Sequence, residues 1–238
     1  MKEGIRSYVL RQGRITPAQQ RALDELYPRF GLAFSDSLLS AEAVFRRRAP
    51  LVLEIGSGMG ETTAAIAAEH PEADFIAVEV HGPGVGSLLN RIAAAGLANV
   101  RVIRHDAVEV LEHMVPDGKL AAVHLFFPDP WPKKRHHKRR LVQPEFVAEI
   151  ARVLRGDGLL HVATDWTDYA DHTREVLARD ARFVAVDAGD LCQNPLAFRP
   201  PTKFERRGRR LGHDVVDLFY RRLDSTTRPP ASRDAAVR

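Results

Sequence analysis

The sequence predicts an α/β fold in which a mainly parallel sheet has helices on both faces and an antiparallel pair of strands at one edge. From residue 50 onward, short apolar runs alternate with longer helical runs, which is typical of a doubly wound sheet. The last two apolar runs, 183–186 and 215–220, have no helical run between them, and this favours an edge hairpin. The 238-residue length is enough for one substantial core.

Seven strands are expected, and turn residues or helix breakers bound most of them. The strands cover residues 51–55, 74–80, 99–103, 120–127, 159–163, 183–186 and 215–220. Helices are expected over 61–70, 85–95, 108–114, 144–154 and 169–179. Pro71, Gly96 and Pro128 each follow one of these runs, because proline cannot continue a helix or a central strand and glycine suits a helix end.

The two ends of the chain differ from this pattern. Residues 1–48 are interpreted as an N-terminal extension with one helix, in which Thr16 is the N-cap and Pro17 takes the first helical position. Residues 223–238 are rich in Ser, Thr, Pro, Ala and Arg and are expected to form a disordered tail. The main domain is therefore expected over 49–222.

Composition excludes several classes of protein. Cys192 is the only cysteine, so a disulfide within the chain and a cysteine-based zinc site are both excluded. The ten histidines show no metal-ligand spacing, and no metal is expected. The chain has neither a run of about 20 apolar residues nor an apolar signal segment, so no membrane contact and a cytoplasmic location are expected.

Positive charge is concentrated in two short segments, although the net charge is only +4. Residues 128–140 contain six lysines and arginines against one aspartate, and residues 199–210 contain six against one glutamate. Basic segments of this kind favour a polyanionic partner, since Lys and Arg displace counterions from phosphates. A solvated charged face is the alternative.

A glycine-rich turn follows the first strand, in the order Glu54-Ile55-Gly56-Ser57-Gly58-Met59-Gly60. The spacing differs from the G-x-G-x-x-G of a dinucleotide site, whose third glycine would stand where Glu61 is, and a nicotinamide-dependent dehydrogenase is rejected on this ground. An acid at the helix entrance also disfavours pyrophosphate. Glu54 would repel a phosphate but attract a cation, and S-adenosylmethionine, a nucleoside with an ammonium and a sulfonium, fits. A purely structural turn is the alternative.

Acids also follow the second and third strands. Glu79 is placed to accept hydrogen bonds from ribose hydroxyls, and Asp106 either accepts from the adenine amino group or caps the next helix. With Glu54, three consecutive strands place an acid at the same edge of one sheet. This pattern is typical of a class I methyltransferase with a Rossmann-like fold.

The segment after the fourth strand gives the most specific indication of function. It contains the turn Pro128-Asp129-Pro130-Trp131 and then the basic run 133–140, and the chain later contains Ala163-Thr164-Asp165-Trp166 and Thr202-Lys203-Phe204-Glu205. From about residue 6 to residue 222 the sequence resembles the tRNA (guanine-N7)-methyltransferase family. The resemblance implies an S-adenosylmethionine-dependent domain over 49–222 that methylates guanine 46 in the variable loop of tRNA. Monomer and homodimer both remain open.

Asp129 is the expected catalytic residue. Guanine N7 has a free lone pair and needs no general base, so catalysis requires positioning and charge placement. A carboxylate facing the N1–H and the exocyclic amine would stabilise the positive charge that develops and would select guanine. Asp129 is also expected to touch the ammonium group of the cofactor. A simple Asx turn is the alternative. Trp131 either stacks on a base or packs the loop.

The remaining assignments concern tRNA. Lys133 is expected to reach the substrate, and the rest of the basic run is expected to contact the RNA backbone. These backbone contacts are Arg135, His136, His137, Lys138, Arg139 and Arg140. The resemblance also implies substrate contacts from Asp165, Thr202, Lys203, Phe204 and Glu205, with Glu205 reading a guanine edge and Phe204 alternatively anchoring the loop.

Two other functions compete with this one. A methyltransferase of similar fold that acts on a protein or a small molecule would use the basic runs only for solubility. A non-catalytic RNA-binding protein would have a vestigial cofactor pocket. The complete set of Glu54, Glu79, Asp106 and Asp129 argues against the second of these.

Overall fold

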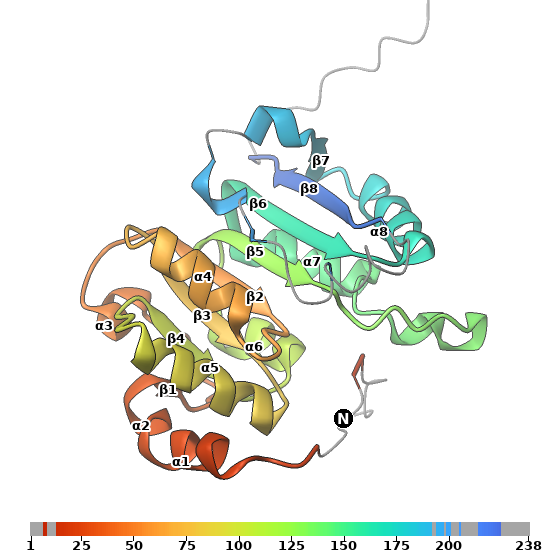
Figure 1. Cartoon of the computed structure of the whole chain (residues 1–238). Coiled ribbons are helices and arrows are strands. Elements are labelled where there is room, and N and C mark those ends of the chain that lie inside the picture. The colour runs from red at the N-terminus through yellow and green to blue at the C-terminus, as the bar shows by residue number, and fades with distance from the viewer. Residues whose placement is uncertain are drawn as a thin grey trace, which may run out of the picture.

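The computed structural model describes residues 7–8, 13–191, 194–197, 199–200, 205 and 214–224. Within these residues, eight strands form one sheet in the order β1-β4-β3-β2-β5-β6-β8-β7 (Figure 1). The strands are β1 Gly31–Leu32, β2 Leu51–Ile55, β3 Asp74–Val78, β4 Val100–Ile103, β5 Leu120–Phe126, β6 Leu154–Thr164, β7 Phe183–Val186 and β8 Val216–Arg222. This confirms the α/β fold class.

The first six strands of the sheet order pair in parallel, and β8 pairs antiparallel with both β6 and β7. The edge hairpin is therefore confirmed. The sheet has one strand more than the seven expected, because the two-residue β1 pairs with β4. A strand this short has no apolar alternation by which the sequence could reveal it.

Helices connect the parallel strands. They are α1 Pro17–Glu25, α2 Tyr27–Phe30, α3 Ala41–Phe45, α4 Glu61–Glu69, α5 Gly82–Ala94, α6 Ala107–Met114, α7 Pro144–Val153 and α8 Thr167–Ala178. Three short 3₁₀ helices are η1 Lys134–Arg139, η2 Ala188–Leu191 and η3 Pro195–Ala197. The described part of residues 1–48 thus contains α1, α2 and α3 where one helix was expected, while the expected tail lies outside the described residues from 225 onward.

Two apolar clusters cover the two faces of the sheet. Leu88 and Leu89 of α5 pack with Ile66 of α4 and Ala22 of α1 on one face. Helices α6, α7 and α8 pack on the other face, where Ile150 of α7 is fully buried. All five residues of β2 and of β3 are buried, which accounts for the mostly apolar sequence of these central strands.

The order of the strands sets the position of a ligand site. The chain builds outward from β2 through β3 to β4 and then returns to β5 on the other side of β2. Ligands of such sheets bind outside the carboxyl ends of the strands where the direction of winding reverses. Ile55 and Leu125 are register partners at that point, near the ends of β2 and β5.

Candidate functional site

The glycine turn between β2 and α4 has two distinct parts. Gly56, Gly58 and Gly60 have φ values of 74°, 56° and 74°, a region that side chains disfavour. A Cβ atom at Gly56 or Gly58 would meet nothing within 4 Å, whereas one at Gly60 would lie 2.5 Å from the Cβ atom of Leu88. The first two glycines therefore face open space, and the third allows α5 to pack closely.

Two acids lie behind this turn. Glu54 is only 4% exposed, and burial, with a contribution from the charge of Glu79, raises the pKa of Glu54 to about 7. Burial also raises the pKa of Glu79, whose two oxygens accept hydrogen bonds from the backbone N–H groups of Gly58 at 2.7 Å and His81 at 2.8 Å. Glu79 thus ties the glycine turn to the end of β3 and keeps further lone pairs for a ligand.

Asp106 occupies the N-cap position of α6, and its Oδ1 accepts a hydrogen bond from the N–H of Val108 at 2.8 Å. The same residue lines the cavity described below. The capping role that the sequence left open is therefore present, and it fixes the carboxyl group at the rim of a cavity. The neighbouring His105 stacks on Phe34, with 3.8 Å between ring centres, and lines the same cavity.

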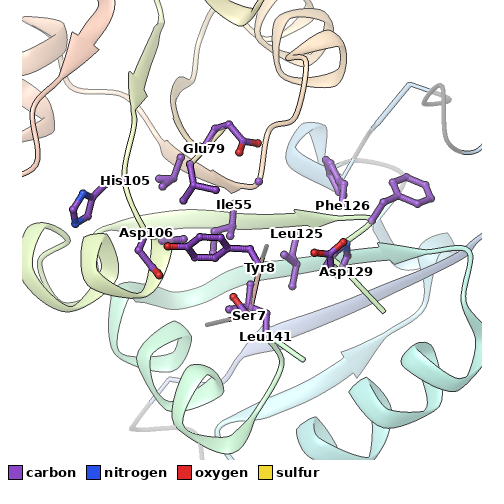
Figure 2. A pocket seen from close by; sticks show the side chains of 16 residues that line it. Ser7, Tyr8, Ile55, Glu79, His105, Asp106, Leu125, Phe126, Asp129 and Leu141 are labelled. Carbon is purple, nitrogen blue, oxygen red and sulfur yellow. The ribbon is translucent and has the colours of Figure 1, made fainter. Parts of the chain in front are cut away.

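A cavity of about 230 Å³ lies at the carboxyl ends of β2, β3 and β5 (Figure 2). Its wall includes three carboxyl groups and several apolar side chains, and no lysine or arginine is among the described residues that form it. The wall includes Glu79, Asp106, Asp129, Ile55, Val78 and Leu125. Such a wall suits a partly apolar ligand with positive charge and disfavours a phosphate.

Asp129 lies on the cavity wall at the end of a constrained turn (Figure 2). Phe127 and Trp131, two residues away on either side, have φ values of 53° and 44°. Positive φ at bulky residues costs about 1–3 kcal/mol each and is concentrated at functional sites. Pro128 and Pro130 restrict the same segment, so the direction of the Asp129 side chain is strongly determined by its backbone.

Trp131 packs against the chain rather than facing solvent freely. Its Nε1 donates a hydrogen bond to the carbonyl oxygen of Ser7 at 2.8 Å, and the Arg139 guanidinium lies 3.8 Å from the centre of its ring. Ser7 and Tyr8 in turn line the cavity. Of the two roles left open for Trp131, packing is the one present in this structure.

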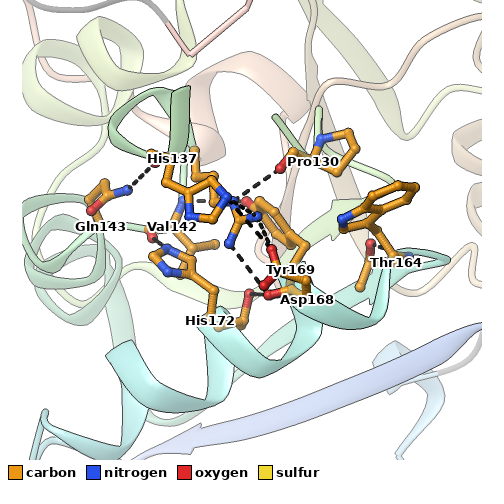
Figure 3. A network of polar contacts seen from close by, with 11 residues as sticks. Pro130, His137, Val142, Gln143, Thr164, Asp168, Tyr169 and His172 are labelled. Atoms are coloured by element: carbon orange, nitrogen blue, oxygen red, sulfur yellow. Dashed lines mark hydrogen bonds and ion pairs between the residues drawn. The ribbon is translucent and has the colours of Figure 1, made fainter. Parts of the chain in front are cut away.

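Arg140 corrects one of the RNA-contact assignments. Its side chain is 1% exposed, and it donates hydrogen bonds to the carbonyl oxygen of Pro130, to Nε2 of His137 and to the Asp168 carboxylate (Figure 3). A guanidinium that is buried and fully engaged cannot contact an RNA backbone. Arg140 instead holds the turn that contains Asp129 against the start of α8.

The other residues of the basic run lie on η1 or next to it, in a segment expected to be a loop. Lys133, Lys134, Arg135 and Lys138 are exposed. His136, His137 and Arg139 are half-buried, and Arg139 also donates to the carbonyl oxygen of Tyr8 at 3.4 Å. The exposed cations are those available to a polyanion.

Glu205 corrects a second assignment. It is 4% exposed, and its Oε2 accepts a hydrogen bond from Nη1 of Arg199 at 2.5 Å. A carboxylate buried in an ion pair is not free to read a guanine edge. Asp165, directly after β6, is half-buried at the same edge of the sheet, while Thr202, Lys203 and Phe204 lie outside the described residues.

Sequence reasoning missed several lining residues. Ser7, Tyr8 and His105 line the cavity, as do Phe126 and Leu141. His105 directly precedes Asp106, which the sequence identified, and could have been identified together with it. Ser7 and Tyr8 precede β2 by more than 40 residues, and nothing in their local pattern indicates contact with it.

The described residues show neither a metal site nor a membrane-spanning helix. No group of three or more His, Cys, Asp or Glu side chains among them could hold a metal ion. Among the same residues, every helix is too short or too polar to cross a membrane.

Comparison with known proteins gives consistent results. A family model described as "Putative methyltransferase" matches residues 48–218. A protein of Nitrosomonas eutropha named tRNA (guanine-N(7)-)-methyltransferase is 54% identical over 216 residues, which cover 91% of this chain and 96% of that protein. A protein of Aromatoleum aromaticum with the same name is 56% identical over 92% of this chain and 83% of its own length.

Solved structures share the fold at low sequence identity. The 16S rRNA methyltransferase KamB matches with a TM-score of 0.55 and 18% identity, over 78% of this chain and 95% of that one. An rRNA methylase from Streptococcus thermophilus matches with a TM-score of 0.50 and 16% identity, over 74% and 88%. These likenesses concern the fold alone.

Proposed function

The chain belongs to the tRNA (guanine-N7-)-methyltransferase family, and on this premise we propose that it transfers a methyl group from S-adenosylmethionine to N7 of a guanine in tRNA. By resemblance, the guanine is that at position 46 of the variable loop. The catalytic domain is proposed over residues 49–222.

One observation supports this proposal most directly. Gly56 of the glycine turn, Glu79, Asp106 and Asp129 surround one cavity, and the exposed cations of η1 follow Asp129 in the chain by only a few residues. A donor pocket and a surface for a polyanion are thus adjacent. A methyltransferase acting on a small molecule would have no use for the second feature.

The residues of the cavity fit S-adenosylmethionine. The open space above Gly56 and Gly58 is what a closely approaching ligand requires, and the buried Ser57 Oγ has no hydrogen-bond partner among the described residues. We assign the ribose to Glu79, the adenine amino group to Asp106 and the cationic end to Glu54 and Asp129. Gly56, Gly58 and Gly60 form the turn beneath it. When bound, the cofactor supplies an electrophilic methyl group.

The protein's own contribution is positioning and electrostatic stabilisation. Guanine N7 attacks with its ring lone pair, so no side chain has to remove a proton. As positive charge develops on the purine, the Asp129 carboxylate, held by its constrained turn, stabilises it. Lys133 and Asp165 are assigned to substrate, with Thr202, Lys203 and Phe204 by resemblance, and the exposed η1 cations to flanking phosphates.

Asp129→Asn tests the catalytic assignment. It keeps the shape of the side chain and removes its charge, and the expected kcat for methylation of unmodified tRNA falls about 100-fold. Asp117→Asn is a matched control, since that carboxylate precedes β5 at the opposite edge of the sheet and pairs with Arg152. Full activity of the Asp129 variant would contradict the assignment.

A further inference from the structure

A buried charge cluster lies beside the candidate site. Nη1 of Arg199 donates to Glu205 at 2.5 Å, while Nε and Nη2 donate to the two oxygens of Asp217 at 2.6 and 2.7 Å. The Arg199 and Glu205 side chains are each 6% exposed. The Asp217 side chain is 32% exposed. Burying the other two charges is costly unless the geometry is good, so such pairs fix one arrangement of the chain more than they add stability.

The same guanidinium reaches the segment that carries Asp129. It lies 5.5 Å from the ring centre of Phe127 and 6.0 Å from that of Phe126, within reach of a cation–π interaction. Phe127 has a φ of 53° and precedes Asp129 by two residues. An interaction that keeps Phe127 in this strained conformation therefore bears on the direction of the Asp129 side chain.

The cluster also reaches the end of β6. Asp217 on β8 is the register partner of Ala163, two residues before Asp165, and its Oδ1 lies 2.8 Å from Nε2 of the buried His161. Burial disfavours the ionised form, but hydrogen bonds from His161 and Arg199 lower the pKa of Asp217 to about 2. Asp217 is therefore ionised at neutral pH, and its two oxygens bind Nε and Nη2 of Arg199.

We propose that Arg199 is a positioning residue for methyl transfer, which joins the end of β5, the end of β6 and the segment that includes Glu205. This inference rests on the proposed function, because the three joined segments carry residues assigned to the guanine side of the site. Glu205 then acts through its pair with Arg199, not by contact with the base.

Arg199→Lys tests the role. Lysine keeps the charge, but it cannot form the bidentate contact with Asp217 and also donate to Glu205. The expected kcat for tRNA methylation falls about tenfold to a hundredfold, as for other small misplacements of reacting groups. The Kd for S-adenosylmethionine, measured by calorimetry, is expected to change by a smaller factor than kcat, because the contacts of Arg199 lead to the Asp129 segment and not to Glu79 or Asp106.

Arg47→Lys is the matched control. Nε and Nη2 of Arg47 donate to Oδ1 of Asp74 at 2.9 and 2.7 Å, and Asp74 is buried at the first residue of β3, at the edge of the sheet opposite the site. This variant is expected to lose Tm and keep the wild-type kcat. Equal kcat values for Arg199→Lys and Arg47→Lys would overturn the inference.

Asp217→Asn provides a second test that does not remove the buried cation. It is expected to lower kcat, and its combination with Arg199→Lys is expected to lower kcat no further, since both act through one contact. Fully additive losses would overturn the inference. An inactive wild-type enzyme would refute the proposed function itself, whereas an active wild type with an equally active Arg199→Lys variant would refute only the role of Arg199.

Discussion

Glu54 is expected to make the affinity for S-adenosylmethionine depend on pH. Burial raises the pKa of Glu54 to about 7, so the group is about half ionised at pH 7, where an ordinary glutamate is fully ionised. A cationic ligand binds better beside a carboxylate than beside a carboxylic acid. Binding therefore releases a proton, and the affinity rises with pH.

The magnitude follows from the pKa. With a value of about 7, about 9% of Glu54 is ionised at pH 6 and about 91% at pH 8. If only the ionised form binds, the affinity rises about tenfold over this interval, or about 1.4 kcal/mol, and about half a proton is released at pH 7. Burial also raises the pKa of Glu79, which acts in the same direction.

Calorimetry at pH 6, 7 and 8, in buffers with different ionisation enthalpies, gives both the Kd and the number of protons released. Glu54→Gln has no ionisable group and is expected to bind more weakly, with a flatter pH dependence. In the ligand-free protein the folded-state pKa exceeds the unfolded value, so stability falls as the pH rises from about 4.5 to about 7. A Kd that is constant from pH 6 to pH 8, with no proton release, would refute the reasoning.

Three further predictions concern the glycine turn, Arg140 and the exposed cations. Gly58→Ala places a methyl group in the open space above the turn at a net stability cost of about 1 kcal/mol, so S-adenosylmethionine affinity should fall more than about tenfold while Tm falls about 2–4 °C. Gly60→Ala, which clashes with Leu88, should lose more Tm than Gly58→Ala, and the reverse order in thermal melts would contradict the division of roles. Arg140→Met leaves the Pro130 carbonyl and Asp168 without their donor and should cost about 2–3 kcal/mol, or about 5–10 °C in Tm. The Lys134→Ala/Lys138→Ala double variant should leave Tm unchanged and reduce the slope of log K against log salt for tRNA binding by about 1–2. An unchanged slope would exclude these two lysines as phosphate contacts.

The parts of the fold that the sequence predicted are those that local patterns encode. The runs of β2, β3 and β5 are buried along their whole length and mostly apolar because both faces of these strands are covered. Acids that directly follow such runs must come to one edge of a parallel sheet. The positions of Glu79, Asp106 and Asp129 around one cavity follow from this rule.

The parts that could not be predicted depend on contacts between distant segments. Arg140 stands in a basic run that resembles an exposed surface, and only the position of Asp168, 28 residues later, makes it a buried anchor. Glu205 is buried in an ion pair with Arg199, which also binds Asp217 on β8. Ser7 reaches the cavity through a hydrogen bond from Trp131, 124 residues away. The residues next to each of these positions in the sequence do not indicate such distant partners.

The central claim is that this chain transfers a methyl group to N7 of a guanine in tRNA. Its most direct test is to treat an unmodified tRNA transcript with the purified protein and labelled S-adenosylmethionine, and then to map the methylated nucleotide and the ring atom that carries the label. N7-methylguanine is expected at one position, in the variable loop. Methylation at another ring atom or on ribose, or no incorporation by a protein that binds the cofactor, would contradict it.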